Sequence, residues 1–229
     1  PELLKSLFHV LSELQHYRTQ LGSNLVYLQQ LVIGCLFSIV DSLKQNPAVK
    51  VDRSVLRADL IVECVRTSTN AQIHNAALLL ISSLASWAPD LVLHSVMPIF
   101  TFMSNTLLRQ SDDYSAHVID QTVSRVVPPL VASLRKKNQD LVTGAAELLL
   151  SFTAAFEHIP LHRRLRLFSH LVNALGPQDF LPAITAMLFD KYPTDKRVPA
   201  FSAELMGSFS PEVQLIAASQ YIDLVTDAL

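Results

Sequence analysis

The chain has 229 residues, of which 50% are hydrophobic and 17% are charged, and its formal net charge is −2. The charged share is below the roughly 25% that is usual for globular domains, so most elements must be covered on more than one side. The small net charge excludes a polycationic nucleic-acid-binding protein, and any such contact would have to be local. Only five glycines occur, which leaves little material for tight β turns or glycine-rich phosphate-binding loops.

The first half of the chain shows apolar residues at helical spacing, separated by short polar or proline-containing stretches. This pattern predicts six successive helices, whose ends or starts are marked by LGSN (21–24), QNPAV (45–49), Leu56, TNAQIH (69–74), Pro89 and the pair Asp112–Asp113. No segment shows sustained strand alternation. We therefore expect an all-α protein.

Residues 78–103 form an apolar run that is long enough to be mistaken for a membrane span. Pro89 and Asp90 interrupt this run, and proline ends a helix because it removes a backbone hydrogen-bond donor. Each remaining piece is shorter than the roughly 20 residues that a span needs. We expect two buried helices joined by a tight corner, and no membrane contact.

Internal self-similarity indicates a repeat protein. IHNAALLLIS (73–82) and VTGAAELLLS (142–151) align without gaps at a separation of 69 residues, and VQLIAAS (213–219) is a looser third copy. Each copy follows a polar residue suited to capping a helix, namely Asn70, Asn138 or Ser210. Because this separation is about twice a 35-residue unit, a less obvious copy is expected between the first two, at 111–123.

This period and layout resemble HEAT repeats, in which antiparallel helix pairs stack into a solenoid. We expect one solenoid over residues 1–229, excised from a longer polypeptide because Pro1 is not an initiator. The expected pairs are 1–45, 52–87, 89–127, 128–158, 160–191 and 195–229. The Asp–Arg ladder common between such repeats is mostly replaced, and His74 stands where an arginine is expected.

Pro128 and Pro129 place a repeat boundary in the middle of the chain. A proline pair inside one long helix would cost about 3 kcal/mol or more, whereas proline is tolerated in the first turn of a new helix. We therefore expect a new helix to start at this pair.

A polar run follows the expected buried helix that carries Phe100 and Phe102. This run contains Arg109, Asp112, Asp113 and Tyr114. Asp112 and Asp113 stand where the next helix begins, and carboxylates there accept unpaired N–H groups and suit the positive end of the helix dipole. Adjacent aspartates do not face each other, so they are poor candidates for an acid–base pair. Two interpretations remain: a turn with a helix cap, or a partner-binding loop.

The stretch MPIFTFMSNTLLRQSDDYSAHVIDQTVSRVVPPLV (97–131) also resembles a known family. The ordered blocks PIFTFM, LLRQ, DDYS, VI and VVP are similar to the giant HEAT-repeat subunit of the small-subunit processome, the U-three small nucleolar RNA-associated protein ten family. The resemblance covers about 35 of the 229 residues. It implies an internal segment of a nucleolar scaffold that assembles the early pre-ribosome with other processome proteins, U-three RNA and pre-rRNA. The same resemblance implies a link to transcription of ribosomal DNA.

Motifs for catalysis and for cofactor binding are absent from the sequence: GxxxxGK[ST], HExxH, GxSxG and CxxC do not occur. His158 and His162 have the spacing of a metal pair, but Pro160 puts them in a corner. Cys35 and Cys64 indicate neither a disulfide scaffold nor a zinc site, which favours a reducing compartment. We expect no enzyme activity, no metal or other cofactor, and no small-molecule substrate.

Basic residues form two groups. Arg163, Arg164 and Arg166 lie on the predicted helix over 160–175, and Arg135, Lys136 and Lys137 lie at an interhelix turn one repeat earlier. Stacked repeats would let the two groups merge into one patch for RNA phosphate or an acidic partner. The alternative is a solvated helix face with cations near a helix C-terminus, where they suit the dipole.

Three classes of function fit this sequence. A scaffold segment is favoured, because solenoids expose long surfaces and nothing here supplies a nucleophile or a cofactor pocket. A karyopherin-like transport adaptor would use the same architecture to bind a cargo peptide or a small GTPase. A helical enzyme would require a deep pocket lined by clustered polar residues from several repeats.

Overall fold

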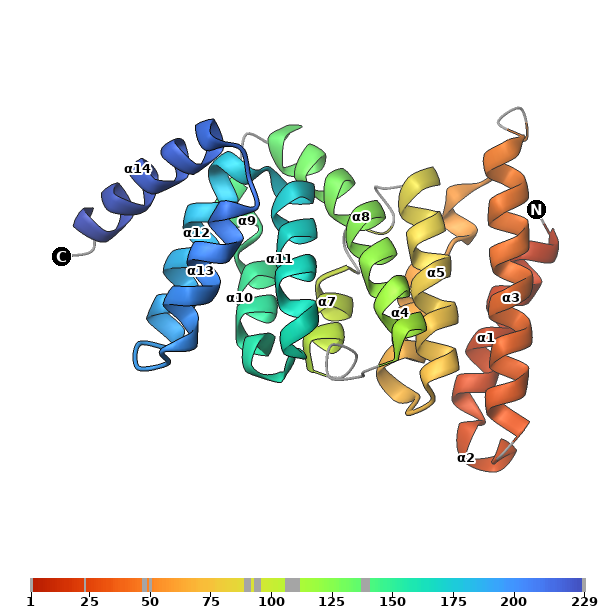
Figure 1. Cartoon of the computed structure of the whole chain (residues 1–229). Coiled ribbons are helices and arrows are strands. Elements are labelled where there is room, and N and C mark those ends of the chain that lie inside the picture. The colour runs from red at the N-terminus through yellow and green to blue at the C-terminus, as the bar shows by residue number, and fades with distance from the viewer. Residues whose placement is uncertain are drawn as a thin grey trace.

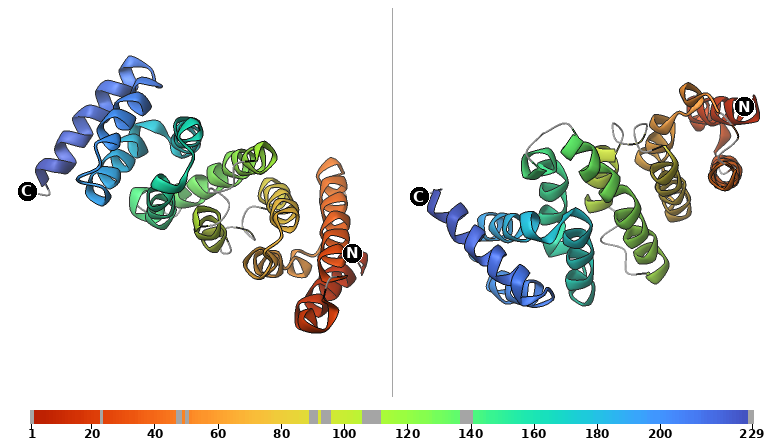
Figure 2. Two further views of the ribbon diagram at one scale, coloured as in Figure 1. Left: turned by 60° about the horizontal axis from the view of Figure 1, so that its bottom comes forward. Right: turned by 90° about the horizontal axis from the view of Figure 1, so that it is seen from above.

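The computed structural model describes residues 2–22, 24–46, 49, 51–88, 92, 96–105, 112–136 and 141–227. Within these ranges every regular element is a helix, which confirms the all-α prediction. The helices stack side by side in an open, elongated array with the two chain ends at opposite ends of the molecule (Figures 1 and 2).

The array has two layers, and within each layer the helices contact one another in chain order. One layer contains α1 (Glu2–His16), α4 (Ala58–Thr67), α7 (Val96–Asn105), α10 (Ala146–Ala155), α12 (Pro177–Lys191) and α14 (Pro211–Asp227). The other contains α3 (Asn24–Gln45), α5 (Ala71–Trp87), α8 (Asp113–Lys136), α11 (Leu161–Leu175) and α13 (Arg197–Gly207). Short elements complete the chain: α2 (Arg18–Leu21), α9 (Leu141–Gly144), and the 3-10 turns η1 (Arg53–Val55) and η3 (Phe156–His158). Two layers that propagate along one axis are the architecture of a helical-repeat solenoid.

The register of the last repeats differs from the sequence-based expectation. The layers alternate from α1 onward, so each repeat consists of one helix from the α1 layer followed by one from the α3 layer. The expected pairs 160–191 and 195–229 start in the α3 layer and are therefore shifted by one helix. The shift arises because a helix boundary was expected at Pro128–Pro129, where the structure has none.

Helix α8 runs without interruption from Asp113 to Lys136 and includes both prolines. Pro128 is exposed and Pro129 is half-buried, while Val127 and Leu130 beside them are buried against neighbouring helices. Proline frees the carbonyl group four residues earlier, and on an exposed helix side water can bond such a carbonyl. The expected boundary was wrong because the prolines fall on the solvent side of an otherwise well-packed helix.

The internal sequence copies do not occupy equivalent places. The first copy lies in α5, in the α3 layer, whereas the copies at 142–151 and 213–219 lie in α9–α10 and α14, in or beside the α1 layer. What the copies share is small residues at helix contacts: Ala77, Ala145 and Ala217 are all fully buried. The similarity therefore reflects close helix approach and not repeat register.

Two other local expectations are confirmed. Asn70 caps α5, because its side-chain oxygen accepts hydrogen bonds from the backbone N–H of Gln72 at 2.8 Å and of Ile73 at 3.3 Å. Phe100 is fully buried, and the partly buried Phe102 packs edge-on against His74 with ring centroids 4.7 Å apart. Asn138, Pro89 and Asp90 lie outside the described residues.

Neutral polar pairs link α5 to α8. Asn75 donates from Nδ2 to the hydroxyl of Ser115 at 3.2 Å, and the hydroxyls of Ser82 and Thr122 lie 3.3 Å apart. All four side chains are buried. At this contact, hydroxyl and amide groups take the place that charged ladders hold in many HEAT repeats, which agrees with the departure noted in the sequence.

Candidate interaction site between α8 and α11

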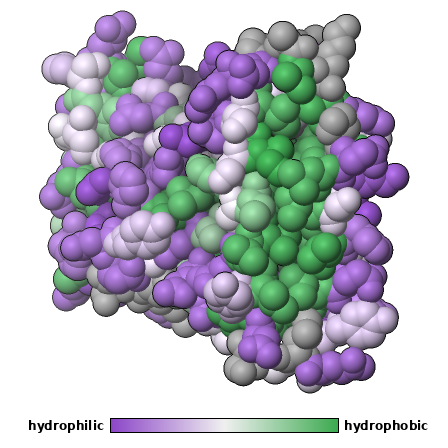
Figure 3. All heavy atoms as spheres, turned by 90° about the vertical axis from the view of Figure 1, so that its right-hand side faces the viewer, coloured by the Kyte–Doolittle hydropathy of each residue, from purple (hydrophilic) through white to green (hydrophobic). Residues whose placement is uncertain are grey.

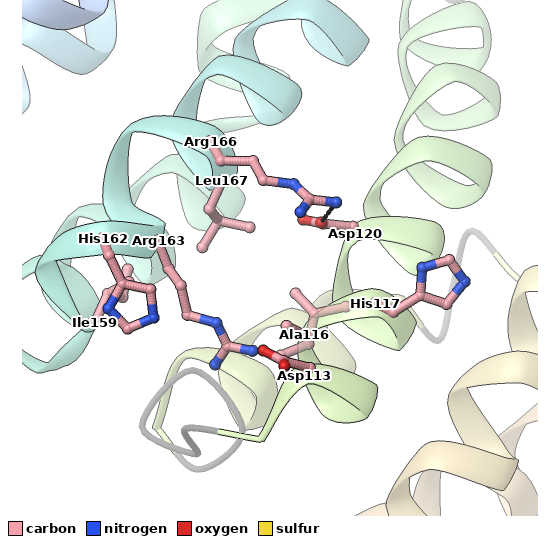
Figure 4. A pocket seen from close by; sticks show the side chains of 10 residues that line it. Asp113, Ala116, His117, Asp120, Ile159, His162, Arg163, Arg166 and Leu167 are labelled. Atoms are coloured by element: carbon pink, nitrogen blue, oxygen red, sulfur yellow. Dashed lines mark ion pairs between the residues drawn. The ribbon is translucent and has the colours of Figure 1, made fainter.

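A pocket of about 280 Å³ opens between the first halves of α8 and α11 (Figure 4). Its lining comprises Asp113, Ala116, His117, Ile119, Asp120, Ile159, His162, Arg163, Arg166 and Leu167. Ile119, Ile159 and Leu167 are buried and form an apolar floor, whereas the charged and imidazole side chains surround it. The pocket brings together one aspartate from the predicted partner loop and two arginines from the predicted basic group.

The start of α8 is fixed by Asp112. Its Oδ1 atom accepts a hydrogen bond from the backbone N–H of Ser115 at 2.7 Å, and its carbonyl accepts from the N–H of Ala116 at 3.2 Å. The bond from Ser115 lowers the pKa of the Asp112 carboxyl, because it stabilises the ionised form. The cap interpretation is confirmed for Asp112, while Asp113 is the first helical residue and lines the pocket.

Tyr114 is not among the described residues that line the pocket. The side chain of Tyr114, in the first turn of α8, is 60% exposed. Arg109 lies outside the described residues. Of the predicted partner loop, Asp113 therefore lines the pocket. Tyr114, the next residue in the sequence, is exposed to solvent.

Two arginines of α11 reach across to α8. Arg163 donates from Nη2 to the carbonyl oxygen of Asp112 at 2.8 Å. Nη2 of Arg166 lies 2.8 Å from Oδ2 of Asp120 (Figure 4). Nδ1 of His170 lies 3.5 Å from the other carboxylate oxygen of Asp120, whose side chain is only 14% exposed. These contacts join consecutive repeats, so both guanidinium groups already have partners within the chain.

Arg164 is buried and contacts the backbone of its own chain. Its side chain is 4% exposed, and it donates from Nε to the carbonyl of Ile159 at 2.8 Å and from Nη2 to the carbonyl of Glu157 at 3.1 Å. Its guanidinium carbon lies 4.5 Å from the centroid of the Phe156 ring. The sequence placed Arg164 in a surface group, and this was wrong because the side chain turns inward to bond the corner that precedes α11.

The two basic groups do not merge. Arg163 contacts the beginning of α8, whereas Nη2 of Arg135, at the end of α8, lies 3.8 Å from where a β carbon on Gly176 would stand. Gly176 follows the last residue of α11, so α8 and α11 run in the same direction and the groups lie at opposite ends, roughly 20 Å apart at 1.5 Å per helical residue. Lys136 is exposed beside Arg135, and Lys137 lies outside the described residues. The prediction of a single patch was wrong because it considered only that repeats stack. It did not include the direction of α11 relative to α8, which places the two groups at opposite ends of these helices.

The acidic and imidazole side of the pocket was not predicted from the sequence. Asp113, His117 and Asp120 recur at four- and three-residue spacing, so they share one face of α8. That spacing was visible in the sequence, but nothing in it showed that this face meets α11. His162 also lines the pocket, whereas the ring of His117 is turned away from the arginines (Figure 4).

The pocket combines an apolar floor with balanced charge. Two carboxylates, of Asp113 and Asp120, stand against two guanidinium groups, of Arg163 and Arg166. The lining therefore lacks the cationic excess on which phosphate binding depends. In the described part of the chain no three potential metal-ligating side chains cluster. Balanced charges around an apolar floor suit a protein side chain or short peptide better than a nucleic acid.

Comparison with known proteins gives the family. Residues 140–225 match the family model described as HEATR1-like, HEAT repeats. Proteins named U3 small nucleolar RNA-associated protein 10 from Pyricularia oryzae and Coccidioides immitis are each 53% identical over all 229 residues. The protein of that name from Neurospora crassa is 50% identical over 99% of the chain. The chain spans 13% of the length of these three relatives. It belongs to the U3 small nucleolar RNA-associated protein 10 family and corresponds to one segment of its HEAT-repeat members.

Proposed function

We propose that this segment is a non-enzymatic scaffold in assembly of the small-subunit processome, acting in the nucleolus on the route to mature 18S rRNA. The observation that carries the proposal is the identity of about half the residues, over the whole chain, with proteins named for association with U3 small nucleolar RNA. The two-layer solenoid supports it, since such arrays offer extended binding surfaces and carry their function in what they hold together.

The scaffold acts by holding its surfaces at fixed spacing. Each repeat buries its helices against the next, and Arg163 and Arg166 add cross-links between α8 and α11. The pocket between these helices then keeps its shape without a ligand. We propose that it receives a peptide segment of another processome protein of the same subcomplex, with Tyr114 as an additional aromatic contact.

We assign direct RNA contact to the other end of α8. Arg135 and Lys136 are exposed in its last turn and have no acidic residue among their neighbours in sequence from 130 to 136. U3 RNA and pre-rRNA are the two RNA partners that fit the proposed role. Phosphate contact by such residues is electrostatic and falls with rising salt.

The test is crosslinking of the full-length protein in cells, read separately for proteins and RNA. We expect peptides of processome proteins to crosslink near Asp113 and Tyr114, and RNA, where present, near Arg135 and Lys136. A charge swap, Asp120→Arg with Arg166→Asp, keeps an ion pair between α8 and α11 but exchanges the positions of its two charges in the pocket. Partner recovery that is unchanged by the swap contradicts a role for the pocket.

The same experiment separates the scaffold from a transport adaptor. Capture of a cargo peptide or a small GTPase from nuclear extract, without processome proteins, would favour the karyopherin-like alternative. Recovery of nucleolar assembly factors favours the scaffold.

A further inference from the structure

An apolar surface covers the end of the solenoid formed by α1 and α3 (Figure 3). Two shallow grooves, of about 570 and 310 Å³, run along it and share Ser38 and Ile39 in their lining. The larger groove lies between Leu3 and Leu7 of α1 and Leu31 of α3. No charged residue lines either groove among the residues that the structure describes.

Helix α3 is strongly apolar, but most of its apolar residues are not buried by the rest of the described structure. By length and composition it could cross a membrane, yet only 28% of its apolar window is buried in the structure. Its buried side chains, such as Ile33 and Leu36, face the rest of the solenoid. Leu31 and Cys35 lie on the opposite, exposed side. Large apolar patches on an exposed surface mark a site that another element covers.

The shape of this face fits a packed helix. Apart from its chain neighbours and the backbone of its own helix, no described atom lies within 4 Å of the place that a β carbon on Gly34 would take. Ser38 stands one turn further along, so Gly34 and Ser38 form a strip of small residues flanked by Leu31 and Ile39. Small residues let two helix backbones approach closely, as at the α5–α8 contact, where Ser82 and Thr122 meet at 3.3 Å.

The position of the face indicates which polypeptide covers it. Among the described helices α3 is the first of its layer, and its other side packs on α5, which packs on α8. The groove therefore faces along the stacking direction of the solenoid. The relatives are several times longer than this segment, which spans 13% of their length. A neutral groove offers nothing to a partner chosen by charge, whereas it matches the neutral side-chain contacts between α5 and α8.

We propose that this groove receives the helix pair that directly precedes the segment in the full-length protein, with one helix of that pair packed along α3 as α3 is packed along α5. The inference rests on family membership and stacking geometry and is independent of the proposed role in the processome.

The occupant is identified by photo-crosslinking in the full-length protein. A benzophenone amino acid replaces Leu31, and a matched variant carries it at Leu150, which has nearly the same exposed fraction, 55% against 54%, but lies on α10 away from the groove. We expect position 31 to crosslink within its own chain, to residues that precede the segment by less than about two repeats, in addition to any product with Leu3 or Leu7 across the groove. Position 150 should give no such product. Mixing isotopically labelled and unlabelled protein shows whether a product joins two copies. A crosslink from position 31 to a second copy, to a different protein or to lipid overturns the proposal.

Thiol labelling gives an independent measurement. Cys35 lines the groove and is exposed in the structure of the segment, so a preceding repeat should protect it in native full-length protein by at least tenfold relative to denatured protein. Leu31→Asp should remove that protection, and Leu150→Asp should leave it intact. Labelling of Cys35 in purified native protein at the denatured rate contradicts the proposal even if Leu31→Asp fails to fold.

Discussion

The guanidinium carbon of Arg164 lies 4.5 Å from the centroid of the Phe156 ring, and both side chains are buried. Phe156 also packs against Phe201 and Phe168, with ring centroids 4.9 and 6.1 Å away. Arg164 thereby joins the corner before α11 to an aromatic cluster that includes α13. A residue that reads as a surface cation in the sequence is a central contact of the second half of the solenoid.

Replacing Arg164 should destabilise the segment. Arg164→Met leaves the carbonyls of Ile159 and Glu157 without their donor and removes the cation–π contact, so we expect a loss of about 2–4 kcal/mol in the free energy of unfolding. Urea unfolding followed by circular dichroism measures it. Arg166→Ala is the control: its ion pair with Asp120 involves a largely exposed arginine, and the loss should stay below about 1 kcal/mol. Equal effects would contradict a buried role for Arg164.

The cap of α5 should be measurable alone. Asn70→Ala removes the acceptor for two backbone N–H groups and should cost about 1 kcal/mol. Asn70→Asp keeps an oxygen in the same place and adds a charge that suits the helix dipole, so it should retain nearly full stability. The midpoint of urea unfolding compares the two. If Asp and Ala are equally destabilising, the cap is not the source of the effect.

The proline pair in α8 provides a stabilising variant. Pro128→Ala restores an N–H donor in the interior of a continuous helix, where proline costs about 3 kcal/mol. The substitution also makes the unfolded chain more flexible, which lowers the gain in stability by about 0.4–1 kcal/mol. Allowing for repacking, we expect a net gain of about 1 kcal/mol or more in unfolding free energy. Pro211→Ala, at the first residue of α14 where proline is tolerated, should give no gain. A loss of stability for Pro128→Ala would show that α8 needs its proline to fit α5 and α11.

Acid should weaken the start of α13 through Asp195. Hydrogen bonds from the side chain and then the backbone N–H of Arg197 lower the pKa of Asp195 to about 2. The folded pKa lies below the usual value of about 3.9 in an unfolded chain. The stabilisation is therefore complete above about pH 4 and is lost as the pH falls towards 2. Unfolding measured between pH 2 and 5 should show a shallower acid decline for Asp195→Asn, and for Arg197→Gln, than for the native sequence. Parallel curves for all three would refute the assignment.

Local chemistry was readable from the sequence, and long-range geometry was not. Asn70 and Asp112 were recognised as caps because a cap depends only on the next three residues. Helical spacing likewise predicted the fold class. Pro128 was misjudged because its cost depends on whether it faces solvent or core, which is set by neighbouring repeats. Arg164 was misjudged for the same reason, and the direction of α11 relative to α8 decided that the two basic groups stay apart.

The side-chain hydrogen bonds between neighbouring repeats join positions at most 51 apart in sequence within the described residues, the largest separation being that of Arg163 and Asp112. Nothing in this pattern ties one end of the array to the other. A mechanical load applied at one end of the array is therefore transmitted only from each repeat to its neighbour. Damage to one junction should soften the array there and leave distant junctions at their original stiffness.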